Sequence, residues 1–381
     1  MKILIVASWY PEPGQLTGSF FRDRARLLAQ HGCEVSVVTA DLRLRTGGAP
    51  PGITVRKDGG VTEYRCFKRN LTPFWEGGVA RQKVPMIRKL YEQVCRDSGK
   101  PDLIHLESAR SARAAVALAR SEQIPLTYTE HYSDVLSSSP GSYYDRVMRL
   151  AVSSASHIFL ISSAMRRKLD PPDGKWSMLP NEVDFSAFTL SESSPPPERF
   201  TFKALGSLRK VKGYDLLLKA FASVHAAYPA CRLVIGGGGE EEAALKSLCD
   251  RLSLSDCVEF PGPVPLEERG AFFRDASAFV CSSHTETFSV VTVEAFACGV
   301  PVVATKCGGP EDLVNKSNGY LVEKDSVSAL ASGLTRMVEN RQRFCGPEIR
   351  AQAAALYDRE VIVKKQMDCF ASVISDYRQS T

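Results

Sequence analysis

The sequence predicts an α/β protein made of two doubly wound domains, each a parallel sheet covered by helices. Lys2–Ala7 is a short apolar run typical of a buried parallel strand, and a helical pattern and a second apolar run follow it. Beyond a polar, proline-rich stretch at 191–197, the same alternation starts again at Phe202. The length of 381 residues suits two domains of ordinary size. We place the boundary at 185/186, within or just before that stretch.

The first half predicts a βαβ unit followed by further strands. Its strands are expected at residues 2–7, 34–39, 103–106, 125–129 and 157–161, and its first helix at 19–30. The loop at 8–18 is rich in turn formers but lacks Gly-x-Gly-x-x-Gly, so the dinucleotide fingerprint of a dehydrogenase is absent there. His131 follows the fourth strand and is therefore expected at the carboxyl edge of the sheet, as a structural or a functional group.

The second half carries two distinctive loops. Phe202–Gly206 predicts a strand, and the basic loop 209–212 (Arg-Lys-Val-Lys) follows it, where cations could stabilise a departing diphosphate. The next strand, from Arg232, runs into four glycines. Three acids at 240–242 follow these glycines and would repel a phosphate, so the glycines indicate a close backbone approach instead.

Two carboxylates eight residues apart stand out near the end of this half. Glu286 follows the apolar strand pattern 278–281, and Glu294 lies inside an apolar helical pattern at 290–297. Both are therefore expected near the carboxyl edge of the sheet, where open α/β folds bind ligands. A carboxylate in an apolar helix needs a partner, and a ligand hydroxyl would serve. The helix start offers free backbone N–H groups that suit a phosphate.

These residues resemble the E-x7-E signature of the retaining, nucleotide-sugar-dependent glycosyltransferases of family 4, also called glycosyl transferases group 1. The strand Gly-Val-Pro-Val-Val-Ala and the turn Gly-Gly-Pro-Glu agree with it, and 180–184 resembles the family's Pro-Asn-Gly-Val-Asp with Glu182 in place of glycine. The resemblance covers most of the chain and is loose between 42 and 100. It implies the GT-B fold, two Rossmann-like domains facing a central cleft. The domains would be 1–185 for the acceptor, completed by a last helix at 364–381, and 186–363 for the nucleotide sugar.

The resemblance also implies roles for single residues. The catalytic group would be His131, Glu286, Lys212 and Arg209. The donor-binding group would be Gly18, Ser207, Val264, Thr287, Phe288, Val290, Val291 and Glu294. Glu286 would bind hydroxyls of the donor sugar, Glu294 would bind the ribose hydroxyls, and Val264 would lie near the base. The family usually has arginine where Ser207 stands, so Arg209 would take over that contact.

The implied activity is transfer of a hexose or N-acetylhexosamine from a nucleotide-diphosphate sugar to a glycan or lipid-linked acceptor, with retention (EC 2.4), in cell-surface polysaccharide or glycolipid synthesis. UDP-sugars are favoured over GDP- or ADP-sugars, and no nucleic-acid partner is expected. Three alternatives share the fold: a sugar-nucleotide epimerase, a phosphorylase, for which no pyridoxal-lysine motif is evident, and an inactive sugar-nucleotide-binding module. Assay of a panel of nucleotide sugars would separate them.

Composition bears on cofactors and compartment. No Asp-x-Asp occurs, and the eleven cysteines lack metal-ligand spacing, so we expect no cofactor, no essential metal and a reducing, cytoplasmic location. Residues 1–190 hold 26 Lys and Arg against 19 Asp and Glu, whereas the remainder holds 22 against 24. The basic residues cluster around Phe74 and Trp75. This pattern predicts either a solvated face or peripheral attachment to an anionic membrane at the inner face of the cell. The clustered basic residues are Arg65, Lys68, Arg69, Arg81, Lys83, Arg88 and Lys89.

Overall fold

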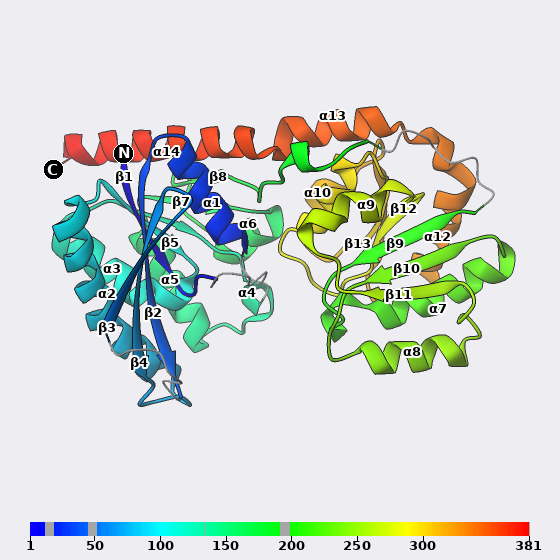
Figure 1. The fold of residues 1–381 in the computed structure, drawn as a ribbon, viewed down its shortest axis with the longest axis horizontal. Helices are drawn as coiled ribbons and strands as arrows, with labels where there is room; N and C mark the ends of the chain where they lie inside the picture. The colour runs from blue at the N-terminus through cyan, green and yellow to red at the C-terminus, as the bar shows by residue number, and fades with distance from the viewer. Residues whose placement is uncertain (12–18, 45–51, 133, 191–198, 381) are drawn as a thin grey trace. The chain divides into compact units, whose positions relative to one another are not determined.

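The computed structural model describes residues 1–11, 19–44, 52–132, 134–190 and 199–380. The chain divides into two compact units (Figure 1). Unit 1 comprises Met1–Pro180 together with Val363–Thr381, and unit 2 comprises Asn181–Ile362. Each unit is a sheet of mainly parallel strands with helices packed on it, so the predicted doubly wound α/β class is confirmed.

Unit 1 contains an eight-stranded sheet in the order β3-β4-β2-β1-β5-β6-β7-β8. All neighbours are parallel except β3 and β4, which form a hairpin. Gly59 and Gly60 make its two-residue turn with φ of 57° and 83°, a conformation that glycine adopts without strain. The strands are β1 Lys2–Ala7, β2 Glu34–Arg43, β3 Gly52–Asp58, β4 Val61–Arg69, β5 Leu103–Glu107, β6 Leu126–Thr129, β7 His157–Leu160 and β8 Trp176–Met178.

The helices of unit 1 lie on its sheet, and α3 packs against both α2 and α5. The helices are α1 Ser19–Gln30, α2 Glu76–Ser98, α3 Ala112–Glu122, α4 Asp134–Ser137, α5 Tyr143–Ser154, α6 Ser163–Leu169 and α14 Arg359–Ser380. The second part of α14 belongs to this unit. Its Phe370 is fully buried against the rings of His105 and Phe159, and its Gln366 accepts a hydrogen bond of 2.8 Å from Arg24 of α1.

Unit 2 contains a six-stranded, all-parallel sheet in the order β11-β10-β9-β12-β13-β14. Its strands are β9 Thr201–Leu205, β10 Arg232–Gly236, β11 Val258–Gly262, β12 Ala278–Cys281, β13 Val302–Thr305 and β14 Gly319–Val322. The strand order reverses between β9 and β12. In sheets of this kind the loops that leave such a reversal at the carboxyl edge form a crevice that binds ligands.

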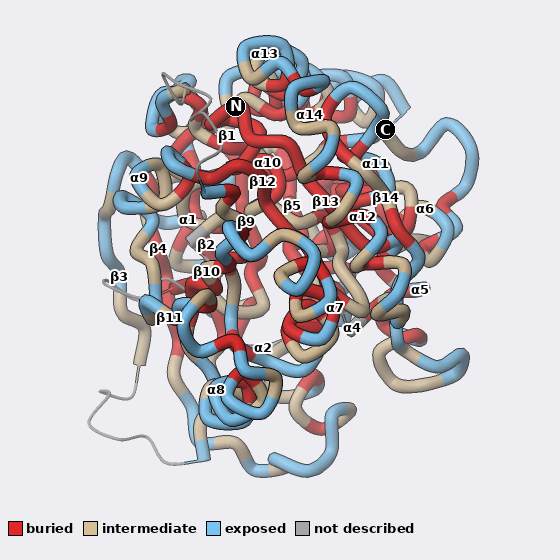
Figure 2. Tube along the Cα trace, turned by 90° about the vertical axis from the view of Figure 1, so that its right-hand side faces the viewer, coloured by how far each residue is buried: buried red, intermediate tan, exposed pale blue. Residues whose placement is uncertain are grey.

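The helices of unit 2 cover both faces of its sheet, and Figure 2 shows buried residues concentrated in the strands while α8 and α13 remain largely exposed. They are α7 Tyr214–Ala227, α8 Glu242–Arg251, α9 Arg269–Arg274, α10 Val290–Ala297, α11 Pro310–Leu313, α12 Val327–Asn340 and α13 Gly346–Tyr357. Among the described residues, no helix combines the length and apolar character that a membrane span requires.

Candidate active site

Two loops of unit 2 meet at the strand-order reversal. One follows β9 and carries Lys212, and the other follows β12 and carries Glu286. They are joined by hydrogen bonds, since Ser282 Oγ donates to the Lys212 carbonyl at 2.9 Å and the His284 amide donates to the Val211 carbonyl at 2.9 Å. Gly213 makes this approach possible. A Cβ there would lie 2.3 Å from the Ser282 carbonyl oxygen, and its φ of +63° also favours glycine.

Lys212 and Glu286 form an ion pair in this crevice. The Lys212 Nζ lies 2.5 Å from Glu286 Oε1, and Ser283 Oγ donates to the same oxygen at 2.9 Å. The backbone of Glu286 is fixed on both sides, because its amide donates to the Cys307 carbonyl and its own carbonyl accepts from Gly309. Burial alone would lower the pKa of Lys212, but the Glu286 carboxylate outweighs it and raises the pKa above its ordinary value. The loop therefore holds a cation that stays charged.

Helix α10 starts at Val290, four residues after Glu286. Its N-cap, Ser289, has φ of 79° and makes no side-chain cap to the helix backbone. The first N–H groups of a helix have no partner within it, so Val290 and Val291 present amide groups at the crevice. Phe288 is 2 % exposed and its ring packs on Tyr357, so only its backbone is placed to serve a ligand.

Glu294 lies in the second turn of α10 and is 2 % exposed. Its Oε1 accepts a hydrogen bond of 2.6 Å from Arg269 Nη1, whereas its Oε2 is buried and has no hydrogen-bond partner among the described residues. Burial raises the pKa of Glu294 above its ordinary value, and Arg269 offsets only part of that rise. A buried acceptor without a partner is costly, and a hydroxyl donated by a ligand would satisfy it.

Three further predicted site residues of unit 2 are Arg209 of the catalytic group and Ser207 and Val264 of the donor-binding group. Arg209 lies 4.0 Å from Glu240, and both side chains are largely exposed. Ser207 is in the same loop and accepts from the Arg209 amide through its carbonyl. Val264 lies beside Gly236, where an added Cβ would be 3.0 Å from its Cγ2.

Two of the four glycines at the end of β10, Gly237 and Gly239, allow the close backbone approach that the sequence predicted. A Cβ on Gly237 would lie 1.8 Å from the Gly206 carbonyl oxygen, and one on Gly239 would lie 2.5 Å from the Leu208 carbonyl oxygen. This contact brings the end of β10 against the loop that carries Lys212.

His131 belongs to unit 1, at the end of β6. Its Nε2 lies 2.9 Å from Glu107 Oε2, and the other oxygen of Glu107 lies 3.1 Å from His105 Nε2. Burial would raise the pKa of Glu107, yet the two histidines outweigh it and hold that pKa well below its ordinary value. The buried carboxylate therefore orients the imidazole of His131. Gly18, which was assigned to the donor site from the sequence, lies outside the described residues.

The turn that carries His131 is held by Glu130. One of its carboxylate oxygens accepts from the amides of His131 and Tyr132, at 3.0 and 3.1 Å. Its other oxygen accepts from the hydroxyls of Tyr128 and Tyr144, at 2.8 and 3.0 Å.

Sequence reasoning missed Glu107, His105 and Arg269. The first two alternate on β5 in Leu-Ile-His-Leu-Glu, a pattern that places both on one face of the strand, so a pairing with the residue after the neighbouring strand could have been anticipated. No local signal marks Arg269, which reaches Glu294 only through tertiary packing. No cluster of His, Cys, Asp and Glu side chains suited to a metal ion occurs among the described residues.

Comparison with known proteins accords with this geometry. The chain is 35% identical over 150 residues to an uncharacterized glycosyltransferase of Haemophilus influenzae, covering 39% of this chain and 42% of that protein. It is 28% identical to the putative teichuronic acid biosynthesis glycosyltransferase TuaC of Bacillus subtilis, over 92% of each chain. The chain thus spans less than half of the first relative and nearly all of the second.

Two solved structures share the fold over nearly the whole chain. Sucrose-phosphate synthase from Thermosynechococcus elongatus superposes with a TM-score of 0.79 at 20% identity, covering 99% of this chain and all of that one. Anabaena HepE in complex with UDP superposes with a TM-score of 0.75 at 19% identity, covering 98% of this chain and all of that one. Residues 17–182 match the family described as glycosyl transferase 4-like domain, and residues 188–354 match glycosyl transferases group 1. The chain therefore has the GT-B fold, with a region similar to the glycosyl transferase 4-like domain followed by a region similar to glycosyl transferases group 1.

Proposed function

We propose that this protein is a retaining glycosyltransferase of family 4. It would transfer a hexose or N-acetylhexosamine from a nucleotide-diphosphate sugar, with UDP as the favoured nucleotide, to a glycan or lipid-linked acceptor. The observation that carries the proposal is the buried Oε2 of Glu294, an acceptor with no hydrogen-bond partner in the described part of the chain, placed at the strand-order reversal of unit 2. The ribose of a nucleotide supplies two adjacent hydroxyls that can donate to such an oxygen.

The surrounding residues suit a sugar diphosphate. Lys212 provides a cation that remains charged, and the amides of Val290 and Val291 add the positive end of a helix dipole. These groups would stabilise the negative charge that develops on the departing diphosphate without a metal ion. Glu286, held by Ser283 and Lys212, would accept hydrogen bonds from the hydroxyls of the donor sugar.

His131 is the candidate group of unit 1 for the sugar end of the donor. Its imidazole is held by Glu107 and packs against the rings of Phe20 and Phe21, at 5.0 and 5.2 Å between centroids. Retention is proposed from the family resemblance, as is the role of cell-surface polysaccharide or glycolipid synthesis. A lipid-linked acceptor would bring the protein from the cytoplasm to an anionic membrane surface.

The test is calorimetric titration of the purified protein with UDP, GDP and ADP, followed by an assay of sugar release from the corresponding UDP-, GDP- and ADP-sugars. We expect UDP to bind with the highest affinity and UDP-sugar turnover to persist in EDTA. Binding of none of the three nucleotides would overturn the proposal. UDP binding without any turnover, even with cellular glycan and lipid extracts as acceptors, would favour an inactive binding module. Interconversion of two UDP-sugars would favour an epimerase.

A further inference from the structure

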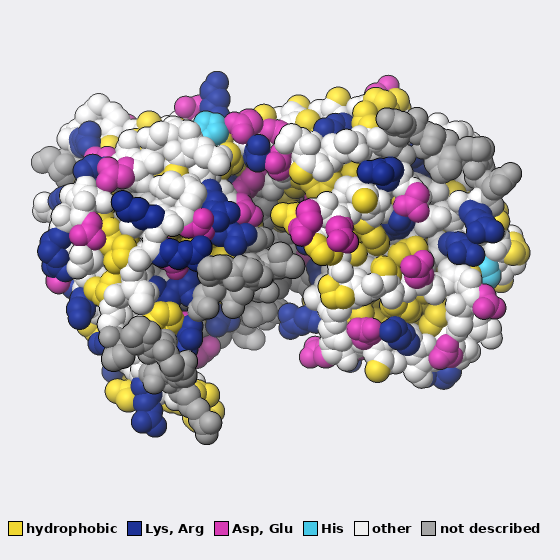
Figure 3. All heavy atoms as spheres, in the orientation of Figure 1, with side chains coloured by type: hydrophobic (Ala, Val, Ile, Leu, Met, Phe, Trp, Pro, Cys, Tyr) yellow, Lys and Arg dark blue, Asp and Glu magenta, His cyan; other side chains and the backbone are white. Residues whose placement is uncertain are grey.

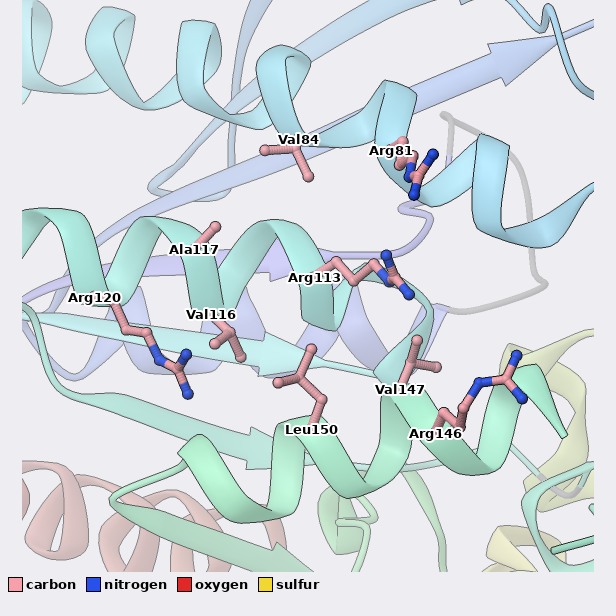
Figure 4. Close-up of a pocket in the computed structure, with 9 residues that line it drawn as sticks. All are labelled: Arg81, Val84, Arg113, Val116, Ala117, Arg120, Arg146, Val147 and Leu150. Atoms are coloured by element: carbon pink, nitrogen blue, oxygen red, sulfur yellow. The ribbon is translucent and has the colours of Figure 1, made fainter. Parts of the chain in front are cut away.

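Unit 1 contains a surface groove that the donor site does not use. It lies between α2, α3 and α5 and has a volume of about 340 Å³. Its floor is apolar and includes Val116, Val147 and Leu150. Figure 4 shows Arg81, Arg113 and Arg146 gathered towards one end of the groove and Arg120 towards the other. The groove therefore combines an apolar floor with cationic walls.

Four arginines line this groove: Arg81, Arg113, Arg120 and Arg146. Within the described part of the chain, none of them lies within ion-pair distance of a carboxylate. Their contacts are neutral. Arg120 donates to Ser154 Oγ at 3.1 Å, Arg146 donates to the Gly141 carbonyl at 2.6 Å, and Arg113 lies over the Tyr143 ring.

Neighbouring arginines on the same helices behave differently. Arg88 of α2 pairs with Glu122, and Arg149 of α5 pairs with Asp145 at 3.1 Å. Glu122 and Asp145 therefore neutralise other arginines of these helices, and neither is among the residues that line the groove. The positive charge is concentrated within the groove. On the face drawn in Figure 3, Lys and Arg side chains also gather over unit 1.

A bare apolar tip adjoins the groove. Leu71, Phe74 and Trp75, in the segment that leads from β4 into α2, are 75%, 99% and 54% exposed. The guanidinium of Arg81 lies 5.4 Å from the centroid of the Trp75 ring, so the tip and the cationic end of the groove are in contact. Large apolar side chains that are fully exposed beside cations are typical of surfaces that enter the interface of a bilayer.

We infer that this groove binds the headgroup phosphate of an anionic phospholipid and that the tip inserts beside it into the membrane surface. Arg81, Arg113 and Arg146 contact the phosphate, and the apolar floor accommodates the glycerol and the first carbons of the acyl chains. Charge alone would also suit a nucleic acid, but an apolar tip beside the cations favours an amphiphile. The inference rests on the proposed function only in placing a lipid-linked acceptor at the same membrane. The binding itself needs no donor.

The structure also corrects the basic cluster expected from the sequence. Arg65 is buried, with Glu63 2.5 Å away and the Tyr10 carbonyl as a second acceptor, so it cannot face a membrane. Arg88 is paired with Glu122. The sequence expectation omitted Arg113, Arg120 and Arg146, because these residues join Arg81 only when α3 and α5 pack beside α2.

Vesicle co-sedimentation tests the inference. Wild-type protein should sediment with phosphatidylglycerol vesicles at low salt, and phosphatidylcholine vesicles should leave it in the supernatant. The double variant Arg81→Gln, Arg113→Gln removes two cations that lie over the rings of Trp75 and Tyr143. The triple variant adds Arg146→Gln, which also removes a hydrogen bond to the Gly141 carbonyl. Each basic residue near an anionic surface contributes about fivefold in partition coefficient, so the triple variant should lose on the order of a hundredfold. Binding should also weaken as salt rises to physiological strength.

The matched control replaces Lys57, Lys100 and Lys175 with Gln. These lysines of unit 1 are exposed and lie near the amino ends of β4, β5 and β8. Their replacement removes the same net charge as the triple arginine variant. The control should keep wild-type sedimentation, and Phe74→Ser should weaken it. The inference is overturned by equal loss in both triple variants, by sedimentation that does not need phosphatidylglycerol, or by groove-dependent binding of an RNA oligonucleotide without vesicle binding. UDP affinity, measured on every variant, should stay at the wild-type value. Absent UDP binding with intact vesicle binding would count against the proposed donor site alone.

Discussion

Glu107 of unit 1 and Glu294 of unit 2 are both buried carboxylates near the carboxyl edge of a parallel sheet, yet their surroundings differ. Both oxygens of Glu107 are engaged by histidines, and its pKa lies well below the ordinary value. Among the residues that the structure describes, only one oxygen of Glu294 has a hydrogen-bond partner, and the pKa of Glu294 lies above the ordinary value. A carboxylate satisfied by the protein positions a side chain. A carboxylate left half satisfied is suited to a ligand.

The largest expected difference between the two carboxylates is in stability. Glu107→Leu leaves His105 and His131 buried without their shared acceptor and should lower the free energy of unfolding by about 3–5 kcal/mol. Glu294→Leu removes a carboxylate that is already poorly satisfied, and its partner Arg269, whose side chain is 26% exposed, can turn towards water. It should cost about 1 kcal/mol or less. Denaturant unfolding of both variants measures the free energy of unfolding. An equal decrease in both variants would contradict the difference between the two carboxylates.

A second prediction compares two basic residues of unit 2, Lys212 and Arg209, which lie in the loop after β9. Lys212→Ala removes the partly buried cation beside Glu286 and should reduce turnover by about 10²–10³-fold, the effect of losing one group that stabilises developing negative charge. Arg209 is 66% exposed, so water screens it and Arg209→Ala should cost less than about tenfold. Steady-state rates of UDP-sugar turnover decide the order. A more damaging Arg209→Ala would show that the loop after β9 is used differently.

The smallest effect is the pH dependence of stability, for which the two carboxylates should have opposite signs. The pKa of Glu107 is lowered on folding, so its contribution is present above its unfolded value near pH 4.3 and is lost as the pH falls through its folded pKa. The pKa of Glu294 is raised on folding, so its contribution is present below about pH 4.3 and is lost as the pH rises through its folded pKa. Unfolding free energies of wild type, Glu107→Gln and Glu294→Gln between about pH 3.5 and 7 would show this. The unfolding free energy of wild type minus that of Glu107→Gln should increase with pH. The unfolding free energy of wild type minus that of Glu294→Gln should decrease with pH. The same sign for both would contradict the assignments.

Much of the framework around the donor site could be predicted from the sequence. The helix expected at 290–297 is α10 with the same bounds, because its apolar run ends in Gly299 and Pro301. The strand 278–281 is likewise β12, since a short apolar run between polar turns has few alternatives. Lys212 and Glu286 could be assigned to one crevice because both follow strands that end at the same edge.

Other features could not be anticipated from local patterns. The hairpin of β3 and β4 was not predicted, although Asp58-Gly59-Gly60 is a turn signal, because the residues around it alternate weakly between apolar and polar types. Arg269 reaches Glu294 across 25 residues, and the basic groove is assembled from three helices. Pairings of this kind depend on packing between elements, for which one sequence holds no direct signal.

The central claim is that Glu294 binds the ribose hydroxyls of the donor nucleotide. Calorimetric titration of wild type and Glu294→Gln with UDP and with 2′,3′-dideoxyuridine diphosphate tests it most directly. Wild type should bind UDP more tightly by about 1.5–3 kcal/mol, the contribution of hydrogen bonds to a charged group. Glu294→Gln should lose most of that preference while its affinity for the dideoxy nucleotide stays close to wild type. If wild type bound both nucleotides equally, or if Glu294→Gln kept the full preference for UDP, the buried oxygen of Glu294 would not be the ribose site.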